Sequence, residues 1–328
     1  MLNLDCEASV KKYDVSIIVP VYNVENFIEK CATSLMKQDY ESIEFIFVND
    51  CTPDKSMEVL QQTLNKYPNR KDDVKIIKNQ QNSGSSITRQ NGLNIASGEY
   101  VLFIDSDDWI EPDMVSKMYQ KTKDNNADIV CCDMVLHYKN RQVYKKNNHK
   151  KIKKGYELKD LVVGHILPSM PNKLIKKELF NDVIFPKFQF GEDSYIMTQL
   201  FYFAKNITYI SEPLFHYNKL NGSSLSTDIS EKTLADIKDM YFSICEFLRN
   251  KGIYCELIKY HRIRLISVVF YNLDNNFIKH LKDIDKKSAK FWLVLQNDKF
   301  SLLQKLVCLL PFIGFNKLFK FIRDVYKR

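Results

Sequence analysis

Short apolar runs alternate with longer amphipathic stretches in the first part of the chain, from Val15 to Met134. The apolar runs have the length of β-strands and lie at residues 15–19, 43–48, 74–77, 100–104 and 129–135. Between them, apolar positions recur with helical spacing at residues 25–36, 57–64, 87–95 and 114–119. This alternation predicts βαβ units and therefore an α/β fold, with a mostly parallel sheet flanked by helices. Ligands of such sheets bind beyond the carboxyl ends of the strands, so the site is expected there.

The alternating pattern is interrupted by a polar, lysine-rich stretch at residues 137–155. We interpret this stretch as a solvated loop or hairpin, with contact to an anionic acceptor or a membrane as the alternative. The α/β pattern then resumes with an apolar segment, a helix and two strand-like runs, at residues 180–190, 192–204, 207–210 and 214–217. From Asp228 onward only helical periodicity is convincing. We therefore predict an α/β domain over residues 1–226 and a helical C-terminal region over residues 227–328.

The composition is that of a packed globular protein, with 45% hydrophobic residues and only nine Gly and nine Pro among 328 residues. The eight cysteines form no C-x-x-C pair, and residues 1–13 lack a basic stretch followed by an apolar core. These features predict reduced thiols and a cytoplasmic location. The net charge of +8 is concentrated at residues 139–154 and after Lys305. Because these basic residues lie in a loop and a terminal helix, a nucleic-acid role is disfavoured.

Three acids lie within four positions directly after the fourth apolar run, at Asp105, Asp107 and Asp108. Carboxylates at positions i and i+2 beyond a strand can approach one cation. Mg²⁺ and Mn²⁺ take oxygen ligands from one or two carboxylates together with substrate phosphates. The pattern therefore favours a divalent metal at Asp105 and Asp107 that bridges to a diphosphate. The alternative is a polar helix start, because acids suit the first turn before Pro112.

Polar side chains also follow the first three apolar runs. The segment Pro20-Val21-Tyr22-Asn23 offers an aromatic face and polar edges where a nucleobase could lie, although it could also be only a turn. Asp50, after the second run, could accept a hydrogen bond from a base N–H or could cap the next helix. Asn82 and Arg89 belong to a glycine-containing turn that opens a helix, where backbone N–H groups and a guanidinium could meet phosphate or ribose.

Together these motifs resemble, in their order, the family 2 glycosyltransferases with the Rossmann-like GT-A fold. The resemblance spans roughly residues 15–226 and rests on five motifs at residues 20–23, 49–54, 82–92, 105–109 and 191–193. Family members bind a nucleotide-sugar, usually a UDP-sugar, coordinate Mn²⁺ or Mg²⁺ through a D-x-D sequence, and invert the anomeric centre. The resemblance therefore implies an inverting hexosyl- or N-acetylhexosaminyltransferase. Its acceptor is expected to be a glycan or lipid-linked saccharide in surface polysaccharide synthesis, such as capsule or O-antigen.

The resemblance also implies a role for each matched position on the donor side. Asp50 is expected to hold the base, Tyr22 to flank it, and Arg89 to steady the nucleotide. Asp105 is expected to reach the ribose or the donor sugar. The remaining donor-binding positions are Pro20, Val21, Asn23, Asn82, Ser106 and Lys173. For Lys173 a surface lysine is the alternative.

The same resemblance implies the metal ligands and the catalytic base. Asp105 and Asp107 match the metal-binding aspartates, and His216 is either a further ligand or a packed residue. Asp193 becomes the general base that takes the acceptor proton, with Glu192 as the competing choice. An acidic helix start is the structural alternative for both. The sequence departs from the common pattern at three positions on the donor side, which weakens any inference about the sugar: Pro53, Thr88 and Gln90.

Two other functions compete with transfer. A nucleotidyltransferase that forms nucleotide-sugars would need a glycine-rich phosphate loop near the first strand, and Pro20-Val21-Tyr22-Asn23 is not one. A non-catalytic nucleotide or glycan binder would lack working acids, whereas Asp105, Asp107 and Asp193 are all present.

The C-terminal end has the pattern of an interfacial helix. Residues 302–310 are apolar but are too few to span a bilayer, which takes roughly 20 residues. Beyond Pro311 an apolar stripe comprises Phe312, Phe315, Leu318, Phe319, Ile322 and Val325. Its cationic margin comprises Lys317, Lys320, Arg323 and Lys327. We therefore expect this helix to lie at a membrane surface, with a helix docked on the catalytic domain as the alternative. Together with the resemblance, this implies a peripheral protein at the cytoplasmic face of the inner membrane.

Overall fold

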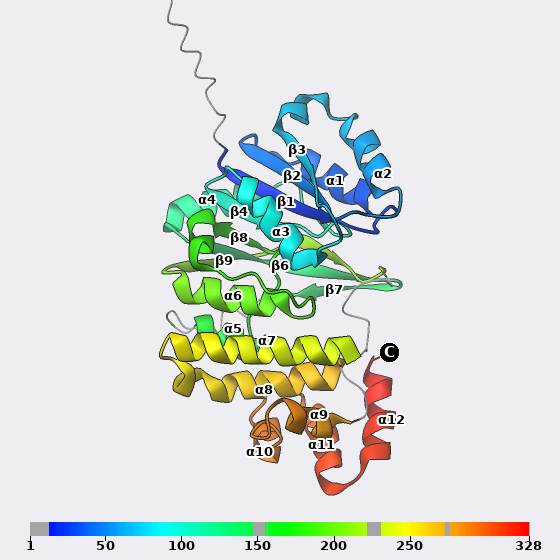
Figure 1. The fold of residues 1–328 in the computed structure, drawn as a ribbon, viewed down its shortest axis with the longest axis vertical. Coiled ribbons are helices and arrows are strands. Elements are labelled where there is room, and N and C mark those ends of the chain that lie inside the picture. Colours follow the sequence, from blue (N-terminus) through cyan, green and yellow to red (C-terminus); the bar gives the residue numbers. More distant parts are fainter. Residues whose placement is uncertain (1–12, 147–154, 156, 222–230, 273–275, 328) are drawn as a thin grey trace, which may run out of the picture.

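The computed structural model describes residues 13–327 apart from residues 147–154, 156, 222–230 and 273–275. Within these residues a nine-stranded sheet has the order β3-β2-β1-β4-β8-β6-β9-β5, and β7 pairs with β6 (Figure 1). The strands are β1 (Val15–Val21), β2 (Ile43–Asn49), β3 (Val74–Lys78), β4 (Tyr100–Phe103), β5 (Trp109–Ile110), β6 (Ile129–Tyr138), β7 (Arg141–Lys145), β8 (Lys173–Lys176) and β9 (Ile207–Asn218).

The helices of the α/β part are α1 (Ile28–Met36), α2 (Ser56–Leu64), η1 (Pro68–Asp73), α3 (Gly84–Ile95), α4 (Met114–Asn125), α5 (Glu157–Val163), η3 (Lys177–Asp182) and α6 (Glu192–Phe203). Strands β1 to β4 are parallel throughout, as the alternating pattern predicted. Along β1, Val15 and Ile17 face one core while Ile18 faces the other, which is the alternation of a strand buried on both sides.

The second half of the sheet differs from the prediction. The observed sheet is mixed, because β8 runs antiparallel to both β4 and β6, while β5 and β7 run antiparallel to β9 and β6. Strand β8 was missed because only Leu174 and Ile175 are apolar between its flanking lysines. The two strand-like runs at 207–210 and 214–217 form one strand, β9, whose pairing with β6 shifts register near Pro213. The predicted loop or hairpin is a β6–β7 hairpin as far as residue 146, and residues 147–154 lie outside the described part.

Two apolar cores cover the two faces of the sheet. One lies under α1 and α4 and includes Leu35 and Met118. The other lies under α3 and α6 and includes Leu93 and Leu200. Because both faces are covered, the edge where β1, β2 and β4 end is left as the place for a ligand.

The C-terminal region is helical, as predicted, and stacks beneath α6 (Figure 1). Its helices are α7 (Glu231–Asn250), α8 (Tyr254–Asn272), α9 (Phe277–Ile284), α10 (Phe291–Leu295), α11 (Leu302–Leu309), η5 (Leu310–Ile313) and α12 (Asn316–Lys327). Leu248 and Ile266 share a core with Val162 of α5 and Tyr195 of α6, so this region packs directly on the α/β part. The expected boundary near Ser226 lies outside the described residues. No helix in the described part is long and apolar enough to cross a membrane.

Candidate active site

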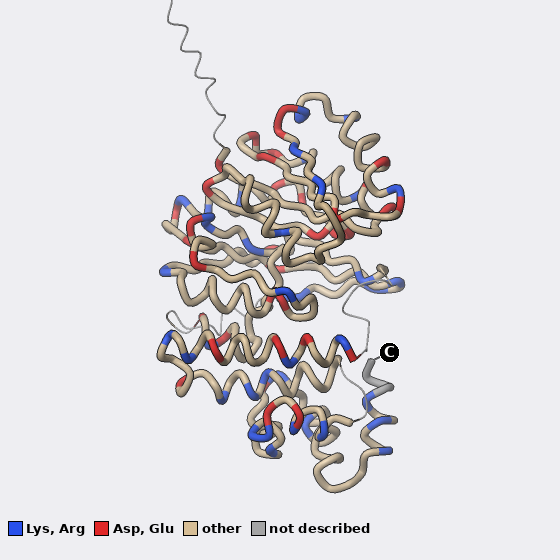
Figure 2. The backbone as a smooth tube through the Cα atoms, in the orientation of Figure 1, with Lys and Arg blue, Asp and Glu red and all other residues tan. Residues whose placement is uncertain are grey.

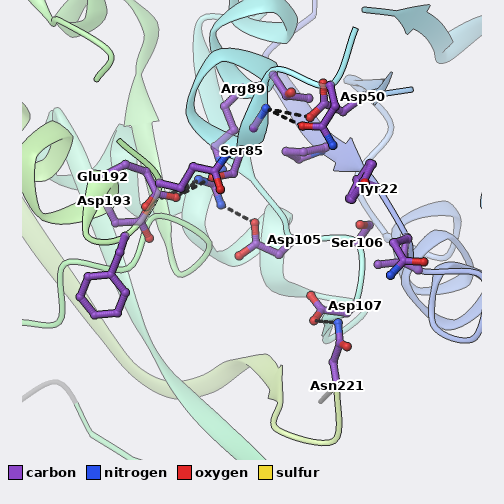
Figure 3. A pocket seen from close by; sticks show the side chains of 18 of the residues that line it. Tyr22, Asp50, Ser85, Arg89, Asp105, Ser106, Asp107, Glu192, Asp193 and Asn221 are labelled. Carbon is purple, nitrogen blue, oxygen red and sulfur yellow. Dashed lines mark hydrogen bonds and ion pairs between the residues drawn. The ribbon is translucent and has the colours of Figure 1, made fainter. Parts of the chain in front are cut away.

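A cavity of about 460 Å³ opens at the carboxyl ends of β1, β2 and β4. It collects most of the residues predicted from the sequence, namely Pro20, Tyr22, Asn23, Asp50, Asn82, Arg89, Asp105, Ser106, Asp107, Glu192 and Asp193. Figure 3 shows Tyr22 and Asp50 toward one side of the cavity and Glu192 and Asp193 toward the other. Segments from distant parts of the sequence therefore meet in one site.

Asp50 anchors the loop that begins α3. Its Oδ1 accepts hydrogen bonds from the Asn79 side chain at 2.7 Å and from the Ser83 backbone N–H at 2.8 Å. Its Oδ2 accepts from the Gly84 N–H at 2.9 Å. Gly84 has a φ of +79°, a conformation that glycine adopts without strain. The carboxylate lies in the cavity wall and shapes the turn that carries Asn82.

Arg89 is the charged centre of the site, and its side chain is only 4% exposed. Nη2 lies 2.5 Å from Asp105 Oδ1, while Nη1 lies 3.0 Å from Glu192 Oε1 and 3.4 Å from Asp193 Oδ1. Burial disfavours the charged guanidinium, but the surrounding carboxylates outweigh burial and raise the pKa of Arg89 above its usual value. One cation therefore connects the acids that follow β4 to the acids that begin α6.

The acidic pair Glu192-Asp193 occupies the first turn of α6, where the helix dipole favours negative charge. Glu192 accepts a hydrogen bond from Ser85 Oγ at 2.8 Å, and Asp193 Oδ2 accepts one from the Met170 N–H at 3.3 Å. Burial, with the charge of Asp193, raises the pKa of Glu192 to about 7. Burial also raises the pKa of Asp193. The Asp193 side chain is 25% exposed against 11% for Glu192, so Asp193 is the more accessible carboxylate.

Asp107 faces the cavity beside Asn221, a residue that the sequence pattern does not predict. Asn221 Nδ2 donates to Asp107 Oδ2 at 2.9 Å (Figure 3). Burial and the nearby charge of Asp105 raise the pKa of Asp107. Asp108 points away into the protein, where Oδ1 accepts a hydrogen bond from the Asn218 N–H at 2.7 Å and the buried Oδ2 has no hydrogen-bond partner among the described residues. Asp108 thus holds the end of β9, and with it Asn221, against the acids.

Comparison with known proteins identifies the family. The model of glycosyl transferase family 2 matches residues 16–184, more than half of the chain. The chain belongs to glycosyl transferase family 2. Glycosyltransferase GlyA of Streptococcus pneumoniae is 32% identical over 250 residues, which cover 73% of this chain and 35% of GlyA. The chain thus spans about a third of the length of that relative.

Two solved structures share the fold of this family 2 chain. S. aureus TarS, residues 1–349 in complex with UDP-GlcNAc, superposes with a TM-score of 0.64 at 20% identity, covering 96% of this chain and 91% of that one. The mannosyltransferase PcManGT from Pyrobaculum calidifontis, in complex with GDP-Man and Mn²⁺, gives a TM-score of 0.53 at 13% identity, covering 96% and 87%. The GT-A fold expected from the sequence is therefore confirmed.

Three residues expected in the donor or metal site of this family 2 chain do not line the cavity. Val21 is buried in the core. Lys173 is fully buried, and its Nζ donates to the carbonyls of Leu167 and Ser169 at 2.7 and 2.6 Å, so it is not the surface lysine of the alternative reading. Burial lowers the pKa of Lys173.

His216, the third, has both ring nitrogens engaged. Nε2 lies 2.6 Å from Glu111 Oε1, and Nδ1 lies 2.9 Å from Nε2 of His137. The ring also stacks on Trp109 with centroids 5.2 Å apart. In this arrangement His216 is a packed residue beside the site. The sequence pattern had left open whether His216 is a packed residue or a further metal ligand. Among the described residues no three His, Cys, Asp or Glu side chains converge as a metal site.

Several cavity residues had not been predicted from the sequence: Val24, Gly84, Ser85, Thr88, Gln189, Phe190, Gly191, Tyr217 and Asn221. Ser85 and Thr88 belong to a recognised motif, so their motif could have pointed to them. Tyr217 and Asn221 carry no local signal, because β9 reaches the site only through pairing with β5 and β6.

Proposed function

We propose that this chain transfers a sugar, with inversion, from a UDP-sugar to a glycan or lipid-linked acceptor, using Mn²⁺ or Mg²⁺. The observation that carries the proposal is the single cavity shared by Asp107 and Asp193. Metal-binding carboxylates and a separate accessible carboxylate are the two parts that inverting transfer from a nucleotide diphosphate requires. A nucleotidyltransferase or a non-catalytic binder has no comparable use for the second acid.

The donor set in the cavity fits a divalent metal. Asp105 and Asp107 offer hard carboxylate oxygens, and Asn221 adds an amide group beside Asp107. Burial and mutual repulsion disfavour charge on Asp107, a penalty that a bound cation would relieve. When bound, the metal would neutralise charge on the departing diphosphate. The Mn²⁺ in the complex of the structurally similar PcManGT agrees with this choice.

Donor orientation follows from the two ends of the cavity. Tyr22 is exposed and is suited to stack on a base, while Asp50 lies behind it in the wall. Asp193 lies at the opposite side (Figure 3). A nucleotide with its base near Tyr22 and its diphosphate at Asp107 directs the sugar toward Asp193. The UDP-GlcNAc complex of TarS supports uracil as the base.

Asp193 is the proposed general base. Its carboxylate takes the proton from the acceptor hydroxyl as that oxygen attacks the anomeric carbon, and the bond from that carbon to the diphosphate breaks. The guanidinium of Arg89 holds the carboxylate in position and favours its ionised form. A single displacement of this kind inverts the anomeric centre. Glu192 is bound to Ser85 and Arg89 and serves to position the pair.

The proposed place of action is the cytoplasmic face of the inner membrane, in the synthesis of a surface polysaccharide. Support comes from the resemblance to enzymes with lipid-linked acceptors and from the cationic, apolar C-terminal end.

Release of UDP from UDP-sugars in the presence of Mn²⁺ and a membrane extract tests the proposal. Wild type should release UDP from one donor and form a product with inverted configuration. Asp193→Asn should bind that donor with unchanged affinity and release no UDP above background. Full activity of Asp193→Asn would remove the proposed base.

A further inference from the structure

Exposed apolar side chains are concentrated at one end of the molecule. Of the 19 large apolar side chains exposed in the described residues, ten lie between residues 291 and 321. They come from α10, α11 and the segment from η5 into α12, and their exposed fractions run from 44% to 76%. We call them the terminal apolar face: Phe291, Trp292, Leu295, Leu302, Leu303, Leu306, Ile313, Phe315, Leu318 and Phe321.

This face overlaps only in part with the stripe that helical periodicity predicted, because Phe315 and Leu318 belong to both. Phe319 of that stripe is fully buried, and Phe312 and Ile322 pack against the same core. Phe321, outside the stripe, is among the most exposed side chains of the face. Phe319 and Ile322 of the predicted stripe thus dock α12 on the core, where Phe319 contacts Phe270 of α8 and Phe277 of α9. Phe315 and Leu318 of the stripe remain exposed among the described residues, together with the other members of the face.

The same segment is strongly basic. Residues 290–328 contain eight Lys and Arg against two Asp, a net charge of +6 out of +8 for the whole chain. Lys317 and Lys320 are exposed, and they are sequence neighbours of Leu318 and Phe321. Figure 2 shows several Lys and Arg positions along the helices at this end of the molecule. Anionic lipid headgroups attract such lysines, and aromatic and leucine side chains enter the boundary between headgroups and acyl chains.

We propose that the terminal apolar face docks on an anionic lipid bilayer. A second copy of the chain is a poorer occupant, because two such faces would bring like charges together. Figure 1 shows α10, α11 and α12 at the end of the molecule remote from β1 to β4, so docking leaves the donor side of the cavity open. A docked chain would lie next to acceptors that are linked to lipids of the same bilayer. This consequence rests on the proposed function, whereas docking on the bilayer does not.

Vesicle co-sedimentation tests the proposal on the full chain. Wild type should sediment with vesicles of equal parts phosphatidylglycerol and phosphatidylcholine, sediment much less with phosphatidylcholine alone, and be released by high salt. Ile313→Ser/Phe321→Ser should weaken binding by at least about tenfold. Lys317→Glu/Lys320→Glu should weaken binding to the anionic vesicles and leave the little binding to phosphatidylcholine unchanged.

Matched controls separate docking from folding and from catalysis. Ile76→Ser/Ile184→Ser and Lys71→Glu/Lys78→Glu alter exposed positions outside the face and should bind vesicles as wild type does. Every variant should keep wild-type helical circular dichroism and affinity for UDP with Mn²⁺, so lost docking is distinguishable from a lost donor site. Wild type that stays in the supernatant with anionic vesicles would overturn the proposal. So would an Ile313→Ser/Phe321→Ser variant that dissociates a dimer while vesicle binding is unchanged.

Discussion

The guanidinium of Arg89 lies 2.5 Å from the carboxylate of Asp105 and is almost fully buried. This contact joins the segment after β4 to the middle of α3 and, through the second arm of Arg89, to α6. The position that the sequence suggested for holding a nucleotide is thus also the support for the acids of the site.

Arg89→Met should destabilise the protein and impair the site. Removal of the cation leaves the partly buried carboxylates of Asp105, Glu192 and Asp193 without their counter-charge, and loss of one partner from such a cluster costs about 3 kcal/mol. Urea unfolding measures the change. Arg89→Lys keeps the positive charge but loses the two-armed guanidinium. Its free energy of unfolding should therefore lie between those of wild type and Arg89→Met. An unfolding free energy equal to that of wild type in Arg89→Met would contradict the supporting role.

Gly191→Ala should lower the turnover number more than it weakens donor binding. Gly191 has a φ of +82°, and an added Cβ would lie 2.4 Å from the Met240 sulfur of α7, so either the Met240 side chain or the backbone before Asp193 must shift. Steady-state kinetics measures the effect. Gly252→Ala is the matched control, since Gly252 has a φ of +73° and open space around it. Gly252→Ala should lose about 1–2 kcal/mol of unfolding free energy through backbone strain and keep the wild-type turnover number.

His216→Ala should leave metal-dependent nucleotide binding intact. Both ring nitrogens are already engaged by Glu111 and His137, and the ring packs on Trp109. The substitution should cost about 1 kcal/mol of stability through the lost hydrogen bonds. Calorimetric titration with UDP and Mn²⁺ checks the prediction. A variant that binds UDP equally weakly with and without Mn²⁺ would make His216 a ligand after all.

Glu192→Gln should remove part of the pH dependence of stability. Burial and the charge of Asp193 raise the pKa of Glu192 to about 7 from the usual 4.5. Between these values the folded protein holds a proton that the unfolded chain releases. The contribution of this group is therefore full below pH 4.5 and is lost as the pH rises through about 7. Urea unfolding at about pH 5 and about pH 8 should show a larger fall for wild type than for Glu192→Gln. Equal falls would contradict the raised pKa.

Local patterns were enough to predict the parallel half of the sheet and the acids at its edge. Each strand from β1 to β4 ends within a few residues of a motif, so Asp50 and Asp107 could be placed by order alone. The antiparallel β8 could not be predicted, because two apolar residues between lysines carry too little periodicity. The contact of Asn221 with Asp107 spans 114 residues, and that of His216 with Glu111 spans 105. Such pairs depend on the pairing of β9 with β5 and β6, which the sequence pattern does not specify.

Calorimetric titration with UDP and with GDP, each with and without Mn²⁺, tests the central claim most directly. The metal is proposed to join the nucleotide diphosphate to Asp107, so UDP should bind wild type and Asp193→Asn more tightly with Mn²⁺ than without it. Asp107→Ala should lose this gain, and GDP should bind more weakly than UDP throughout. Equal affinity for UDP in wild type and Asp107→Ala, with Mn²⁺ present, would contradict the account.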